Sequence, residues 1–361
     1  MNQQAIDRLF GTLAARYEHG EISVEKNRLP GTVEAPRAEE IARLPEPGTP
    51  ARQALEQKGR ETVEAGKLGV VILSGGMATR FNYDHPKGLF PIYEGKSFLQ
   101  MKLEAVQALG RRVPIYVMTS FATHEAVGAH LAENGYFGLD PRDVVLFRQY
   151  RLPRMAPGGG MFYEEGEVSY AAPGHGDFPY AFRESGALRD FLDRGGRYLL
   201  FSNVDNLGAT VDPAIVGSHV ASGKEMTVEV AAKNPGDQGG APARVNGRLQ
   251  LVEGFAFPEG FDHDAIHVFN TANYVFTAEA LAREFELPWY VVEKKVDGQK
   301  VIQFEHLAGD LSVRLSTQFL LVDREERFLP VKSQSDVPEV QAVLSRRWPA
   351  KLAAWRTGAR T

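Results

Sequence analysis

The stretch "LGVVILSGGMATRFNYDHPKG", residues 68–88, joins a continuous apolar run to two glycines, then places an arginine and a lysine seven residues apart. The apolar run predicts a buried strand. Gly75 and Gly76 let the backbone approach a ligand closely, and successive amides at a strand end form an anion site. Arg80 can bind phosphate oxygens with paired N–H donors, and Lys87 is a compact positive charge. The stretch therefore predicts an anion-binding loop after a buried strand, although a plain Gly-Gly turn explains the two glycines equally well.

Strand and helix patterns alternate after Lys67. Apolar runs typical of buried strands alternate with apolar residues at helical spacing, in segments 68–74, 96–110, 114–120, 122–135, 143–149, 187–196 and 197–206. This alternation predicts an α/β fold with a Rossmann-like, mostly parallel sheet covered by helices, and such sheets bind ligands beyond the carboxyl ends of their strands. After Lys224, strand-rich segments predict antiparallel additions to that sheet or a small side sheet.

The pattern divides the chain into three ranges. Residues 1–66 predict a helical N-terminal segment, in which the proline-rich residues 43–53 form a connector. Residues 67–310 predict the Rossmann-like domain that holds the ligand. Residues 311–361 predict a short C-terminal segment with a final helix, whose arginines are those of a solvated helix face.

Composition excludes several classes of protein. The chain has 361 residues, no cysteine and a net charge of −5, from 41 basic and 46 acidic side chains. Disulfides, thiolate metal sites and cysteine nucleophiles are thereby excluded, and a general nucleic-acid or membrane-surface binder is disfavoured. The apolar runs are too short to cross a bilayer, and the first 20 residues look like an amphipathic helix instead of a signal peptide. A cytoplasmic protein without a P-loop or a dinucleotide fingerprint is expected.

Further polar motifs follow the predicted strands. Asp205 in "SNVDN" ends a buried strand, where a carboxylate can hold Mg²⁺, and His175 lies between two glycines in "PGHGD". "FNTAN" at residues 269–273 offers amides suited to sugar hydroxyls, and "FLPVKSQSD" presents Lys332 beyond an apolar stretch. Each motif also has an ordinary explanation: a turn aspartate, a turn histidine, polar residues at a strand edge and a surface lysine.

The order and combination of these motifs are more specific than any one of them. The stretches "LSGGMATRF…HPKGLFPI", "FRQYRLPRM", "PGHGDFPYAF", "SNVDNLGATVDP", "VFNTANYVF", "DGQKVIQFE" and "RFLPVKSQSD" follow one another between residues 59 and 345. In this respect the chain resembles the UTP–glucose-1-phosphate uridylyltransferase (UDP-glucose pyrophosphorylase) family, and it is more similar to the eukaryotic-type enzymes. The resemblance implies a nucleotidyltransferase core of the GT-A-like kind, which joins UTP to a sugar 1-phosphate.

The resemblance also implies contacts for the nucleotide and the sugar. Gly75 and Gly76 would place their amides near the nucleotide, and Gln149 would read the uracil edge together with Gly174. The expected sugar contacts are His175, Asn206 and Asn273.

Charged residues would act on the phosphates. The resemblance implies that Lys87 contacts phosphate, that Lys332 bridges phosphates at the reaction centre, and that Asp205 holds Mg²⁺. Arg80 would hold the leaving pyrophosphate, since a guanidinium binds two phosphate oxygens at once. No protein nucleophile is needed, because the phosphate of the sugar is already an anion.

The sugar and the assembly leave alternatives open. His175 in "PGHGD" favours glucose 1-phosphate, whereas Arg80 and "HPKG" are more similar to the branch that uses N-acetylhexosamine 1-phosphates. Ala78 stands where the family usually has glycine, so the loop is expected slightly further from the nucleotide. A non-catalytic sensor of nucleotide sugars on the same fold is a further alternative. The chain stops about 25 residues after "SQSD", so the β-helical C-terminal domain of eukaryotic relatives is expected to be absent, and the oligomeric state stays open.

Overall fold

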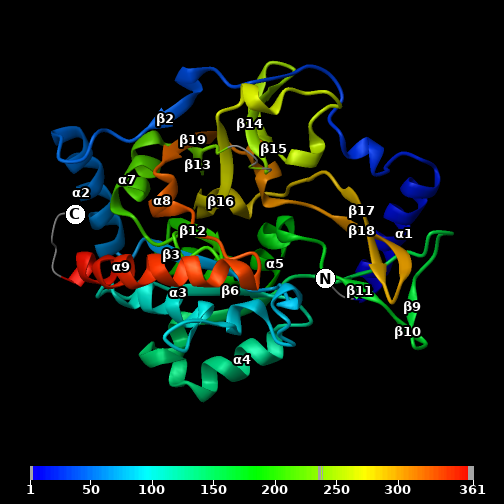
Figure 1. Ribbon diagram of the computed structural model, residues 1–361, viewed down its shortest axis with the longest axis horizontal. Helices are drawn as coiled ribbons and strands as arrows, with labels where there is room; N and C mark the ends of the chain where they lie inside the picture. The colour runs from blue at the N-terminus through cyan, green and yellow to red at the C-terminus, as the bar shows by residue number, and fades with distance from the viewer. Residues whose placement is uncertain (1–2, 235–236, 238, 357–361) are drawn as a thin grey trace.

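An eight-stranded sheet runs through the middle of the protein (Figure 1), in a computed structural model that describes residues 3–234, 237 and 239–356. Its strands, in spatial order, are β2 (Ile41–Arg43), β19 (Thr317–Val322), β13 (Met226–Ala232), β16 (Val268–Thr277), β12 (Tyr198–Asn203), β3 (Leu68–Leu73), β6 (Ile115–Thr119) and β7 (Val144–Arg148). Strand β16 is antiparallel to both of its neighbours, and all other neighbouring pairs in the sheet are parallel. The predicted α/β fold with a mostly parallel mixed sheet is therefore confirmed.

The strand order reverses at β3. The chain first builds outward through β6 and β7 on one side of β3, and then returns to place β12 on the other side. A crevice opens where the connections leave a sheet in opposite directions, at the carboxyl ends of the strands. The glycine loop that follows β3 lies at this point.

Helices cover both faces of the sheet. The α-helices of the described residues are α1 (Gln3–Glu18), α2 (Pro50–Glu64), α3 (Phe98–Gln107), α4 (His124–Glu133), α5 (Phe178–Glu184), α6 (Ala187–Asp193), α7 (Pro213–Ser222), α8 (Arg324–Arg327) and α9 (Val337–Arg356). One face packs against α2, α3, α4, α7 and α9, and the other packs against α5 and α6. Residues 357–361, which the sequence predicts as part of this last helix, lie outside the described residues.

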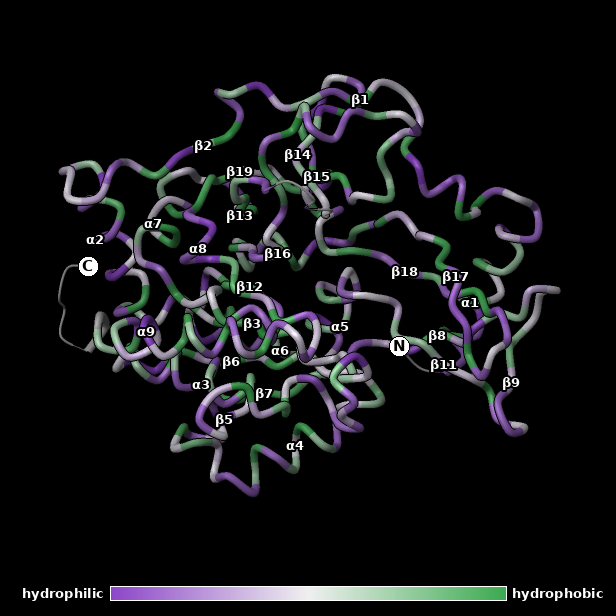
Figure 2. Tube along the Cα trace, in the orientation of Figure 1, coloured by the Kyte–Doolittle hydropathy of each residue, from purple (hydrophilic) through white to green (hydrophobic). Residues whose placement is uncertain are grey.

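Strand β3 illustrates why the sheet needs two cores. Val70 and Ile72 belong to the first core, whereas Val71 belongs to the second. Successive strand side chains point to opposite faces, so a strand that is covered on both sides must be apolar throughout. Figure 2 accordingly shows hydrophobic residues along the central strands and hydrophilic residues along most outer turns.

The ends of the chain join the central sheet. Residues 1–66 contain the expected helices α1 and α2. They also contain β1 (Val33–Glu34), which pairs with β14 (Ala241–Val245) in a separate side sheet, and β2, which pairs with β19 in the central sheet. In the described part of residues 311–361, β19 joins the central sheet and α9 follows it along the chain. The sequence gives no sign of β1 and β2, because each is a short strand that forms only by pairing with a strand more than 200 residues away.

Smaller sheets surround the main one. They pair β4 (Pro91–Tyr93) with β5 (Lys96–Ser97), β8 (Leu152–Pro153) with β11 (Tyr170–Ala171), β9 (Tyr163–Glu164) with β10 (Glu167–Val168), β14 (Ala241–Val245) with β15 (Arg248–Val252), and β17 (Tyr290–Val296) with β18 (Gln299–Glu305). Helix α1 packs beside β8, β17 and β18 at one end of the molecule (Figure 1). Within the described part of the chain, every helix is too short or too polar to cross a membrane.

Candidate active site

A cleft of about 420 Å³ opens at the carboxyl ends of β3, β7 and β12. It brings together seven residues that the sequence predicts for the site. They are Gly75, Gly76, Lys87, Gln149, Gly174, His175 and Asp205. Other lining residues were not predicted: Leu73, Met118, Ala172, Asn203, Val204 and Glu305.

Gln149 and Gly75 meet at one end of this cleft. The backbone N–H of Gln149 donates to the carbonyl of Thr119 at 2.9 Å, which fixes the chain just beyond β7. A Cβ atom on Gly75 would lie 2.6 Å from the Gln149 Nε2 atom, closer than any real contact. Glycine is therefore required at position 75 if the Gln149 amide is to keep its place. The amide carries both a donor and an acceptor, as recognition of a uracil edge requires.

Lys87 and Asp205 form an ion pair in the cleft. The loop from Gly76 to Lys87 closes on itself, since the Lys87 N–H donates to the Gly76 carbonyl at 2.9 Å. The ammonium of Lys87 also lies 5.3 Å from the centre of the Phe81 ring. Asp205 lies two residues beyond the end of β12, across the reversal point, so the fold brings a cation from the β3 loop to a carboxylate from the β12 loop.

The "PGHGD" loop forms another wall. Gly174 has φ of 89°, and an added Cβ would lie 2.6 Å from the carbonyl oxygen of His306, so a larger residue is excluded. The Nδ1 atom of His175 accepts the N–H of Ala308 at 2.9 Å. Burial, with a smaller effect from His306, lowers the pKa of His175 to about 4. The imidazole is therefore neutral at pH 7, and its proton lies on Nε2, where it can be donated to a ligand oxygen.

Glu305 lies in the same cleft, at the end of β18. Burial raises the pKa of its carboxyl group, although Lys294 opposes the shift. The glutamate at the end of "VIQFE" is visible in the sequence, but only the fold shows that β18 reaches the cleft.

Asn206 and Asn273 are placed differently from the sequence expectation. Asn206 is 2% exposed, and its Nδ2 donates to the Asn273 Oδ1 and to the Arg327 carbonyl, both at 3.1 Å. Its Oδ1 accepts the N–H groups of Gly208 at 3.1 Å and Leu329 at 2.9 Å. All four hydrogen-bonding positions of Asn206 are thus occupied within the protein, and Asn273 is fully buried beside it. In this structure the two amides hold the Asp205 loop against the segment after α8, and neither lines the cleft.

Arg80 and Lys332 lie on exposed loops that adjoin the cleft. The Arg80 loop is closed by a bridge between Met77 and Pro86, and Lys332 follows Pro330, which pairs with Asn206. Neither side chain is among the residues that line the cleft in this structure.

The sheet and its cleft are those of the doubly wound α/β class, in which ligands bind at the reversal point of the strand order. Within this class, the chain belongs to the UTP–glucose-1-phosphate uridylyltransferase family, whose family model matches residues 21–352.

Relatives with this description occur in distant organisms. UTP–glucose-1-phosphate uridylyltransferase 2 of Dictyostelium discoideum is 30% identical over 300 residues, which cover 78% of this chain and 59% of the relative. The enzyme of that name from Musa acuminata is 30% identical over 77% of this chain and 63% of its own length. The chain therefore spans about three fifths of these relatives.

Solved structures share the fold. UDP-glucose phosphorylase from Trypanosoma brucei has a TM-score of 0.77 at 24% identity, over 94% of this chain and 75% of that chain. The UDP-N-acetylglucosamine pyrophosphorylase of the same organism has a TM-score of 0.73 at 20% identity, over 90% of this chain and 79% of that chain.

Proposed function

We propose that this chain is a uridylyltransferase that forms UDP-glucose and pyrophosphate from UTP and glucose 1-phosphate. The observation that carries the proposal is the cleft itself, which gathers a uracil-compatible amide, two glycines and a lysine–aspartate pair from separate strand ends. Membership of the family supports the same reaction. The donor and acceptor of Gln149 match the uracil edge, whereas cytosine reverses that pattern.

Positioning and charge neutralisation perform the proposed reaction. A phosphate oxygen of glucose 1-phosphate attacks the α-phosphorus of UTP in line, the bond to the bridging oxygen of the β-phosphate breaks, and pyrophosphate leaves on the opposite side. Lys87 neutralises the phosphates as the two anions approach, and this contribution is largest in the transition state. Arg80 and Lys332, on the adjoining loops, would move onto the phosphates when the substrates bind.

The Asp205 carboxylate fits a role in holding Mg²⁺. Mg²⁺ is usually bound by one or two carboxylates together with waters and substrate phosphates. In the described residues, no group of three or more His, Asp or Glu side chains could hold a metal ion, so we expect waters and substrate phosphates to complete the coordination of Mg²⁺. Bound Mg²⁺ would supply charge to polarise the phosphate oxygens. Because Lys87 pairs with Asp205 here, we expect the ammonium to turn from the carboxylate to phosphate once the substrate is in the cleft.

A second candidate is transfer to N-acetylglucosamine 1-phosphate, which the similarity to the UDP-N-acetylglucosamine pyrophosphorylase fold favours. His175 argues for glucose, since its Nε2–H can donate to a hexose hydroxyl, and we expect the bulk of its ring to leave too little room for an acetamido group. Rejection of an oversized group by a steric clash is stronger than the discrimination of about 1–3 kcal/mol that one methylene provides.

A panel of sugar 1-phosphates tests both candidates. Pyrophosphate release is measured with UTP and Mg²⁺, and each product is identified by mass. We expect a higher kcat/KM for glucose 1-phosphate than for N-acetylglucosamine 1-phosphate. The opposite preference would establish the second candidate. Binding of UDP-sugars without pyrophosphate release from any sugar would indicate a non-catalytic sensor.

A further inference from the structure

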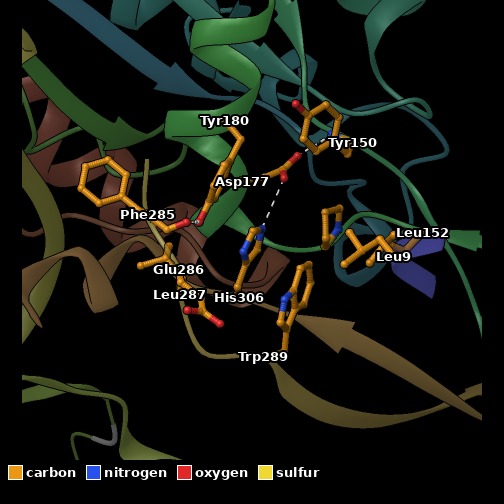
Figure 3. Close-up of a pocket in the computed structure, with 11 residues that line it drawn as sticks. Leu9, Tyr150, Leu152, Asp177, Tyr180, Phe285, Glu286, Leu287, Trp289 and His306 are labelled. Atoms are coloured by element: carbon orange, nitrogen blue, oxygen red, sulfur yellow. Dashed lines mark hydrogen bonds and ion pairs between the residues drawn. The ribbon is translucent and has the colours of Figure 1, made fainter. Parts of the chain in front are cut away.

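A second cavity, of about 240 Å³, is drawn in Figure 3, and its lining residues are sequence neighbours of residues that line the cleft. Figure 3 shows His306 near its centre, with Trp289 on one side and Tyr180 on the other. The buried base of the cavity includes Asp177 and His306, which are 1% and 4% exposed, and exposed Glu286 also lines it. The remaining lining residues are apolar or aromatic: Leu9, Tyr150, Leu152, Pro173, Phe285 and Leu287.

Three segments separate this cavity from the cleft. In each segment, neighbouring residues line different sides: Gln149, Gly174 and Glu305 line the cleft, whereas Tyr150, Pro173 and His306 line the second cavity. The wall is thus one backbone thick. A molecule in the second cavity would press on the same segments that position the residues of the cleft.

Asp177 ties the wall together from inside the cavity. Its Oδ1 lies 3.3 Å from the His306 Nε2, and its Oδ2 accepts the backbone N–H of Tyr150 at 2.5 Å. The backbone N–H of His306 donates to the Pro173 carbonyl at 2.8 Å. All three wall segments therefore meet in one hydrogen-bonded cluster, and a change at any of these contacts reaches the others.

The chemistry of the lining defines the ligand. The His306 ring stacks on Trp289 at 4.2 Å and on Tyr180 at 5.6 Å between centroids, so the wall presents flat aromatic surface. The hydroxyl of Tyr180 donates to the Phe285 carbonyl, and that of Tyr150 donates to Glu184. Asp177 keeps acceptor capacity, since a carboxylate has about four acceptor positions. The cavity thus suits a planar apolar molecule that carries an N–H or O–H donor.

The size of the cavity limits the ligand to about two fused rings. An apolar cavity of roughly 150 Å³ accommodates benzene, and 240 Å³ leaves room for a second ring. Among the described lining residues there is neither lysine nor arginine. A phosphate or carboxylate ligand is therefore disfavoured, which distinguishes this cavity from the cleft.

We propose that the second cavity is a binding site for a neutral, planar, one- or two-ring molecule with a hydrogen-bond donor, and that its occupancy tightens binding in the cleft. The coupling rests on the proposed function, because it requires that UTP occupy the cleft. A ring bound in the second cavity restrains the three wall segments, so less conformational entropy of these segments is lost when the nucleotide binds in the cleft.

Calorimetric titration of the full chain with indole tests the site. We expect indole to bind, and 1-methylindole, which lacks the donor, to bind about tenfold more weakly because it cannot form the hydrogen bond to the Asp177 carboxylate. Leu9→Phe fills the cavity from α1 and should weaken indole binding about tenfold or more. Thr12→Phe places the same ring on an exposed part of α1 and should leave indole binding unchanged. Trp289→Leu removes the ring that stacks on His306 and should also weaken indole binding, independently of Leu9→Phe. Absence of indole binding, or binding unaffected by Leu9→Phe and Trp289→Leu, would overturn the site.

UTP titrations with and without saturating indole test the coupling. We expect UTP to bind about fivefold more tightly in the presence of indole, and indole to gain the same factor from UTP, since coupling between binding sites is reciprocal. Equal or weaker UTP binding would overturn the coupling. If UTP fails to bind even without indole, the proposed function and the coupling fail together, while the indole titrations still decide whether the second cavity is a ligand site.

Discussion

Substitution of Gly75 by alanine should displace Gln149 and weaken UTP binding without unfolding the protein. The added Cβ would lie 2.6 Å from the Gln149 Nε2, and ordinary contact begins at 3.4 Å, so the amide must retreat by about 0.8 Å. The backbone at Gly75 does not have positive φ, so alanine adds no strain there. The contact is with the end of a flexible side chain, which moves more easily than backbone.

The expected loss follows from the hydrogen bonds of the base. A shift of this size breaks one or both bonds to the uracil edge, and a buried polar group left unpaired costs about 1–3 kcal/mol. UTP affinity should therefore fall about 5- to 150-fold, and the preference for UTP over CTP should shrink with it.

A double-mutant cycle isolates the mechanism. The UTP Kd is measured for Gly75→Ala, for Gln149→Ala and for the double variant, with thermal melting to check the fold. Gln149→Ala removes the clashing atom, so adding Gly75→Ala to it should cost little, and the two effects should be strongly non-additive. Gly158→Ala, an exposed glycine with nothing within 4 Å of the added Cβ, is the control for a glycine-to-alanine change. Additive losses would refute the reasoning, because Gly75→Ala would then act on something other than Gln149.

Other predictions concern charge and pH. Asp205→Ala should lower turnover about 10²-fold or more in Mg²⁺ while UTP binding without metal changes little; near-native turnover in steady-state assays would exclude the metal role. Lys87→Ala should lower kcat more than it raises KM, and a change confined to KM would contradict a transition-state role. Arg80→Ala should weaken pyrophosphate binding more than UDP-glucose binding in parallel titrations. Equal losses of affinity for the two ligands would count against a role of Arg80 in holding pyrophosphate. Burial lowers the pKa of His219 to about 4 in the folded protein, whereas the pKa of this histidine in the unfolded chain is about 6.5. Between these pH values only the unfolded chain takes up the proton, so the free energy of unfolding should fall by up to roughly 3 kcal/mol as the pH falls from 6.5 to 4. Urea unfolding of His219→Gln should show a shallower pH dependence than the unmodified protein, and an identical slope would exclude His219.

The sequence by itself determined the buried strands and the loops that follow them. Strand β3 needs an apolar residue at every position because both of its faces are covered, and such a run is visible without a structure. The glycines after β3, and Asp205 after β12, could be placed at the ligand edge because the carboxyl ends of parallel strands share one edge. Of the seven predicted residues that line the cleft, Gln149 and Gly174 were predicted only from the family resemblance.

Only the tertiary structure decided which polar groups are free to meet a ligand. Asn206 and Asp205 are adjacent in sequence, yet Asn206 is occupied by four hydrogen bonds within the protein, whereas Asp205 lines the cleft beside Lys87. The places of strand β2 and of Glu305 could not be predicted either. A three-residue strand such as β2 is positioned by its pairing with β19, and the fold as a whole positions the end of the β17–β18 hairpin that carries Glu305. Local patterns determine which backbone conformation a segment prefers. Hydrogen-bond occupancy and the pairing of distant segments depend on contacts that exist only once the chain has folded.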